Sequence, residues 1–253
     1  IQRIRAVGKV VELENALQAK PVSGHLGIAH TRWATHGKPA EHNAHPHLSN
    51  GLAIVHNGII ENHAPLRKQL QDLGYSFTSE TDTEVVAHLL AHHFAETGDM
   101  LSAFRSTLGE IHGAYALAVI HDSEPGTLYC SRMGSPLVIG EGSGEHYLAS
   151  DPLALLQVTD RFRYLEEGDY ARITLTNCEI WDRAGNSADR PVVRYEHAAH
   201  SLDKGEYRHF MLKEIYEQPK VIKATMEGRI TDSRVLEQAL GTDAANLLDN
   251  VRH

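Results

Sequence analysis

The sequence contains only two cysteines, Cys130 and Cys178, among 253 residues. So few cysteines exclude a scaffold held together by disulfides, and they fit a reducing compartment. Both lie in apolar, strand-like runs, where a cysteine usually serves as a small buried hydrophobic residue. The sequence therefore predicts a cytoplasmic location and two structural thiols.

Long apolar runs and an excess of basic charge are also absent. The longest apolar stretch, about residues 114–120, is too short to cross a bilayer, and the first residues lack the hydrophobic region of a signal peptide. The formal net charge is −9, without a run of Lys and Arg. These features exclude a membrane span and argue against a nucleic-acid partner. The first residue is not methionine, which favours a piece of a longer polypeptide.

Helix and strand patterns occur in blocks along the chain. Residues 26–32 and 52–58 have the pattern of short strands. Helices are predicted at 63–73 with Asn62 as cap, at 81–95 from a capping box of Thr81 and Glu84, and near 100–109. Because the predicted helices and strands come in blocks and do not alternate strictly, we favour an α+β fold with helices outside packed sheets. Further strand patterns follow at 113–121, 127–132, 136–140, 146–150, 163–167, 170–175 and 179–183.

The character of the sequence changes near residue 190. Residues 190–206 have no clear period and read as a linker. Helical patterns follow, with a break expected at Pro219. We therefore predict one domain over residues 1–189, and a linker with helices over 190–253 that leads into a domain absent from this sequence.

Three polar clusters lie at the ends of predicted elements: HTRWATHG at 30–37, HNG at 56–58 and SETDTE at 79–84. Arg32 offers a planar set of donors that suits a carboxylate, although a surface ion pair is the alternative. Asp82 can hold an ammonium group, or it can simply interact favourably with its helix dipole. Asn57 and Gly58 can form an oxyanion hole or a tight turn. Together these groups describe a site for an amino acid with an amide side chain.

The same motifs carry a resemblance to a known family. With NAHPH, GAYALAVI, GSPLVIG, LEEGD and KEIYEQP, they are similar, in order and over nearly the whole chain, to the glutaminase half of the glucosamine-6-phosphate synthases. These belong to the class II glutamine amidotransferases. The resemblance implies the four-layer αββα sandwich of N-terminal nucleophile (Ntn) hydrolases, here with its first strand and helix missing. It also implies that glutamine is hydrolysed to glutamate, and that the ammonia aminates fructose 6-phosphate in a separate synthase domain.

The resemblance also implies roles for the residues of the polar clusters. Arg32 would bind the α-carboxylate of glutamine, and Asp82 its α-ammonium group. Asn57 and Gly58 would stabilise the oxyanion.

The remaining residues of the octet receive roles by the same resemblance. Thr35 and His36 would line or order the glutamine-binding loop. Trp33 resembles the family's bulky residue that blocks or opens the channel through which the ammonia passes.

One element of the family pattern is not in this sequence. Family members use a cysteine at the mature N-terminus. Its thiolate attacks the glutamine amide, and its own α-amino group serves as the base. This chain starts at Ile1, inside the family domain, and Cys130 and Cys178 have no free amino group beside them. The chain alone is therefore expected to be inactive.

Two other classes of function compete with this interpretation. A metal-binding protein is suggested by the histidines of EHNAHPH (41–47) and by Glu84, His88 and His92 on one helix face. The ligand spacing is unusual and no cysteine supports it, so we expect no metal and no cofactor. A non-catalytic glutamine-binding regulatory domain is the second alternative. A homodimer is expected from the family, formed mostly through the absent synthase half.

Overall fold

Six antiparallel strands form the main sheet of the protein, which has the order β1-β2-β3-β4-β8-β9. The computed structural model describes residues 1–32, 38–195 and 204–226. Its strands are β1 (His47–Ser49), β2 (Leu52–Ile60), β3 (Gly113–His121), β4 (Leu128–Met133), β8 (Tyr170–Ile173) and β9 (Cys178–Trp181). The long central pair, β2 and β3, aligns Leu52 with His121 and Ile60 with Gly113.

A second antiparallel sheet has the order β10-β7-β5-β6. Its strands are β5 (Val138–Glu141), β6 (His146–Ala149), β7 (Arg161–Tyr164) and β10 (Val192–Arg194). Two short 3₁₀ turns also occur, η1 (Glu41–Asn43) and η2 (Pro152–Leu155).

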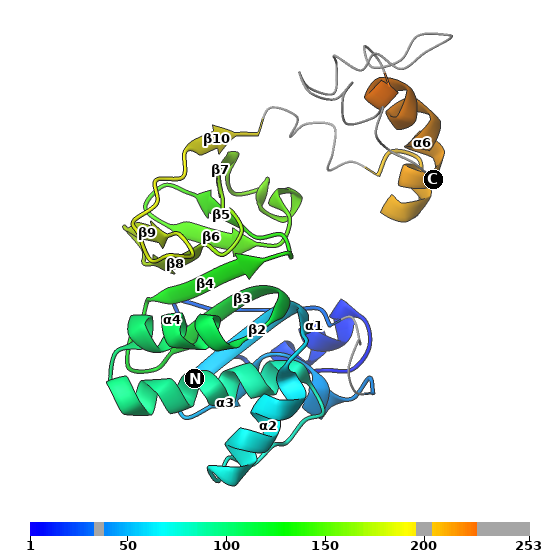
Figure 1. The fold of residues 1–253 in the computed structure, drawn as a ribbon. Coiled ribbons are helices and arrows are strands. Elements are labelled where there is room, and N and C mark those ends of the chain that lie inside the picture. The colour runs from blue at the N-terminus through cyan, green and yellow to red at the C-terminus, as the bar shows by residue number, and fades with distance from the viewer. Residues whose placement is uncertain (33–37, 196–203, 227–253) are drawn as a thin grey trace, which may run out of the picture. The chain divides into compact units, whose positions relative to one another are not determined.

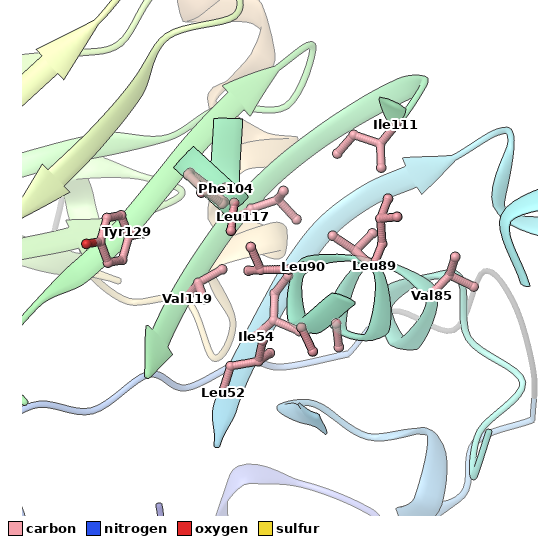
Figure 2. Close-up of a cluster of buried hydrophobic side chains, with 14 of the residues drawn as sticks. Leu52, Ile54, Val85, Leu89, Leu90, Phe104, Ile111, Leu117, Val119 and Tyr129 are labelled. Carbon is pink, nitrogen blue, oxygen red and sulfur yellow. The ribbon is translucent and has the colours of Figure 1, made fainter. Parts of the chain in front are cut away.

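Helices α2 (His63–Asp72), α3 (Asp82–Thr97) and α4 (Met100–Glu110) pack on one face of the main sheet (Figure 1). Alternate residues of β2 and β3 explain this layering, because successive side chains of a strand point to opposite faces. Leu52, Ile54, Leu117 and Val119 face the helices, where they meet Val85, Leu89, Leu90 and Phe104 (Figure 2). Burial of this apolar surface is the main stabilising term for the layer.

The opposite face of the main sheet contacts the four-stranded sheet. Val55, Ala116 and Ala118 join Ile139 and other apolar residues there in a second buried cluster. The described residues thus give one helical layer and two sheets, the α+β arrangement that was predicted. Helix α1 (Val10–Ala19) has no buried residue and adds nothing to either cluster.

Several local predictions need correction. Residues 26–32 form no strand, although Leu26 and Ile28 do pack against the inter-sheet cluster, because among the described residues the segment has no hydrogen-bonded partner strand. Asn62 does not cap α2; its backbone is not extended, and its side chain bonds Glu110 O and His112 N instead, both at 2.8 Å.

The capping box of α3 is half confirmed. Thr81 Oγ1 accepts from Glu84 N at 3.3 Å, as an N-cap does. The Glu84 carboxylate does not return to Thr81 N–H. It accepts instead from the backbone and hydroxyl groups of Thr78 and Ser79.

The contacts divide the chain into two units, Ile1–Ala198 and Ala199–His253. Strand β10 belongs to the first unit, although a linker was expected from residue 190, because three residues are too few to show a period. In the second unit, α6 (Phe210–Met226) continues through Pro219, where a break was expected. In the described part of the chain, no helix is long and apolar enough to cross a membrane.

Candidate functional site

Asn57 and Gly58 lie inside β2, opposite Ala116 and Tyr115 of β3, so the tight-turn alternative is wrong. Gly58 has φ +130°, and a Cβ at this position would overlap the carbonyl oxygen of Ala114. Only glycine combines this conformation with such a close backbone approach. The strand therefore continues past Asn57 with an exposed stretch of backbone at Gly58.

Asp82 is the first residue of α3, and only 4% of it is exposed. Its Oδ2 accepts a hydrogen bond from Ile60 N at 2.8 Å and lies 3.9 Å from His56 Nδ1. A carboxylate in the first turn interacts favourably with the helix dipole, so the dipole alternative describes part of its role. None of these contacts with described residues uses Oδ1, so within the described part of the chain this oxygen is left for a ligand.

Arg32 is half-buried, and its Nη1 donates to Lys38 O at 3.1 Å. This bond joins the two described residues that flank positions 33–37 in the sequence. The predicted site residues Trp33, Thr35 and His36 lie outside the described residues.

These side chains meet at one cavity of about 260 Å³. It is smaller than the roughly 300 Å³ at the lower end of drug-sized pockets, so it suits a ligand the size of an amino acid. The cavity is lined by His30, Thr31, Arg32, His45, His56, Asn57, Gly58, Ile59, Thr81, Asp82 and Thr83. The structure therefore brings together all four predicted site residues that it describes.

Histidines form the wall behind these residues, and sequence reasoning did not assign them to the site. His30 Nε2 lies 2.7 Å from Asn57 Oδ1. The ring of His30 lies against that of His45, with centroids 4.1 Å apart and ring planes tilted by 31°. Thr83 Oγ1 lies 3.2 Å from His45 Nε2 and 3.0 Å from His56 Nδ1. The histidines of EHNAHPH at 41–47, which include His45, were the available signal, but the sequence suggests them only as metal ligands.

Burial keeps the histidine rings near the cavity uncharged at neutral pH. It lowers the pKa of His30, and it lowers that of His45 far below the ordinary range, where the neighbouring His30 and His47 add to the effect. The pKa of His47 falls to about 4, again chiefly through burial. Near neutral pH these rings are therefore uncharged, and Arg32 and Asp82 supply the formal charges at the cavity.

Neither cysteine lines the cavity. Cys130 is fully buried, and burial raises the pKa of its thiol strongly. Burial also raises the pKa of Cys178, to about 11. Both therefore stay protonated near neutral pH, and neither supplies a thiolate nucleophile.

The described residues contain no group of three or more His, Cys, Asp or Glu side chains arranged to hold a metal ion. Glu84 and His88 lie 3.8 Å apart, but His92 is paired with Glu96 at 3.6 Å. The side chains that the sequence suggested as metal ligands on this helix thus contact separate partners.

Comparison with known proteins places the chain in a family. Residues 30–157 match the model of the glutamine amidotransferase domain, and the chain belongs to that family. A solved structure supports the fold: the glutamine phosphoribosylpyrophosphate amidotransferase from B. subtilis is 27% identical. It aligns with a TM-score of 0.51 over 62% of this chain and 35% of its own. The predicted Ntn-hydrolase class of fold is confirmed by this likeness.

Two curated relatives narrow the similarity further. Both are named glutamine–fructose-6-phosphate aminotransferase (isomerizing). The Pseudomonas aeruginosa protein is 56% identical and the Pseudomonas syringae pv. tomato protein 58% identical, each over 100% of this chain. The chain spans 42% of the length of each relative.

Proposed function

We propose that the cavity binds L-glutamine and hydrolyses its side-chain amide. The observation that carries this proposal is the meeting of Arg32, Asp82 and the Asn57–Gly58 pair at one small cavity. A free amino acid presents a carboxylate and an ammonium group, and the two charged residues match them with opposite charges. The amide carbonyl of glutamine is the third group, and it fits the Asn57–Gly58 pair.

The chemistry follows from what this pair can donate. A cysteine thiolate attacks the amide carbon, and the carbonyl oxygen takes the electron pair of the π bond. Asn57 Nδ2–H and the Gly58 backbone N–H stabilise that oxyanion. The carbon–nitrogen bond then breaks, and the nitrogen leaves as ammonia with the proton that the cysteine thiol gave up. Water cleaves the thioester, which releases glutamate and returns the thiol. We assign the thiolate to a cysteine that precedes Ile1 in the parent polypeptide. This term denotes the polypeptide that the cell makes.

The acceptor of the ammonia is proposed from the relatives. Their name supports fructose 6-phosphate as the acceptor, bound by a synthase domain outside these 253 residues. Trp33 is proposed as the gate on the ammonia path, and Thr35 and His36 as parts of the glutamine-binding loop. A homodimer and a cytoplasmic location belong to the same proposal.

A non-catalytic glutamine-binding regulatory domain remains the second candidate. The two protonated cysteines favour it, because neither can attack an amide. Turnover separates the two candidates, whereas binding does not. Release of glutamate and ammonia in equal amounts by the parent polypeptide supports hydrolysis; glutamine binding without any release supports regulation.

A further inference from the structure

We propose that His30 is a positioning residue that orients the Asn57 amide, with its single ring proton on Nε2. This inference rests on the proposed function, because it concerns the oxyanion hole. An Asn side chain has an oxygen at one end and an NH₂ group at the other. If the NH₂ group faces the cavity, Asn57 stabilises an oxyanion; if the oxygen faces it, Asn57 repels one.

The contact between His30 and Asn57 links these alternatives to the tautomer of His30. The two atoms in contact, His30 Nε2 and Asn57 Oδ1, are 2.7 Å apart. An amide oxygen only accepts hydrogen bonds, so this arrangement requires a proton on Nε2. A proton on Nδ1 would leave Nε2 as an acceptor, and the amide would turn its NH₂ group towards the imidazole.

The surroundings of the ring favour the proton on Nε2. His30 Nδ1 is buried, and the described residues give it no hydrogen-bond partner. A proton on that atom would be a buried donor without an acceptor. Leaving such a donor unpaired costs more free energy than a typical hydrogen bond contributes. Burial also lowers the pKa of His30, so the ring carries one proton near neutral pH.

The ring of His45, which lies against that of His30, takes part in a set of three hydrogen bonds. His56 N–H can only donate, and it meets His45 Nδ1 at 3.3 Å. His45 therefore holds its proton on Nε2, which donates to Thr83 Oγ1 at 3.2 Å. Thr83 Oγ1 also lies 3.0 Å from His56 Nδ1, so the same hydroxyl group joins His45 to His56. This closed set of bonds holds His45 in place, and the planes of His45 and His30 are inclined by only 31°.

Glutamine hydrolysis by the parent polypeptide tests the proposal through two substitutions at position 30. His30→Leu removes the donor, and His30→Gln keeps an amide N–H near the position of Nε2. Loss of one oxyanion donor lowers kcat by about 100- to 1000-fold, so His30→Leu should lower kcat by up to that factor while KM stays within about threefold. His30→Gln should recover most of the loss. Thermal unfolding of both variants reports whether they fold.

A double-mutant cycle with Asn57→Ala shows whether His30 acts through Asn57. We expect His30→Leu to cost nothing further in kcat when Asn57 is already Ala. Equal fold losses in both backgrounds, or an unchanged kcat for His30→Leu alone, would overturn the inference and leave the proposed function standing. An unchanged kcat for Asn57→Ala would instead contradict the proposed oxyanion hole.

The tautomer can be observed directly. Nitrogen-15 NMR of histidine-labelled parent polypeptide, with His30→Gln to assign the signal, distinguishes a protonated Nε2 from a protonated Nδ1. A proton on Nε2 supports the inference. A proton on Nδ1 near neutral pH contradicts it, whatever the kinetics of the variants.

Discussion

Asp82 Oδ2 accepts the backbone N–H of Ile60 at 2.8 Å, which joins the start of α3 to the end of β2. This bond joins the polar cluster at 79–84 to β2 two residues after the cluster at 56–58, and it fixes the carboxylate near the Asn57–Gly58 segment. Asp82 therefore has a structural partner for one oxygen and a cavity for the other. The two functions can be separated by substitution.

Asp82→Asn should weaken glutamine binding without unfolding the protein. Asparagine keeps an oxygen for Ile60 N–H but loses the negative charge that faces the ligand ammonium. A hydrogen bond to a charged group contributes about 1.5–3 kcal/mol, so KM for glutamine should rise by about 10- to 100-fold. Steady-state kinetics measure this change. An unchanged KM with normal folding would remove Asp82 from the ammonium site.

Arg32→Ala should weaken glutamine binding severely, because it removes the only cation assigned to the ligand carboxylate. Asp160→Ala is the matched control. Asp160 pairs with Arg194 at 2.7 Å in an exposed ion pair and does not line the cavity. Exposed pairs contribute little, so this control should keep the wild-type KM. Similar behaviour of the two variants would show that the carboxylate site is misplaced.

Gly58→Ala should destabilise the fold more than Gly74→Ala does. Both glycines have positive φ, +130° and +92°, and a side chain there costs about 1–3 kcal/mol in backbone strain. A methyl group at position 74 meets open space, whereas at position 58 it overlaps the Ala114 carbonyl. Chemical denaturation of both variants measures the difference. Equal losses would mean that β2 and β3 relax around the added methyl group.

Acid should destabilise the protein through His47. The folded protein lowers the pKa of His47 from 6.5 to about 4, so the unfolded chain binds this proton more readily. The contribution is fully present above pH 6.5 and is lost as the pH falls towards 4, by roughly 3 kcal/mol in total. His47→Gln should therefore flatten the pH dependence of the unfolding free energy over that range. Parallel curves for variant and wild type would contradict this origin.

The sequence predicted best those features that one residue type or one short pattern encodes. Leu89 and Leu90 mark their helix by period, and Asn57–Gly58, Arg32 and Asp82 carry recognisable chemistry that the structure brings to one cavity. The predictions that were wrong concern features that depend on residues far away in the sequence. Residues 26–32 have a strand pattern but no partner strand among the described residues, and Asn62 bonds across to residues 110 and 112. The role of His30 could not be predicted either, since it depends on a contact 27 residues away.

The most direct test of the account is the hydrolysis of amide-labelled glutamine by the parent polypeptide, measured for wild type and Asn57→Ala. The account predicts that wild type releases glutamate and labelled ammonia in equal amounts, and that Asn57→Ala lowers kcat by about 100- to 1000-fold. No glutamate from wild type at saturating glutamine, or equal rates for the two proteins, would contradict a glutamine-hydrolysing site in this cavity.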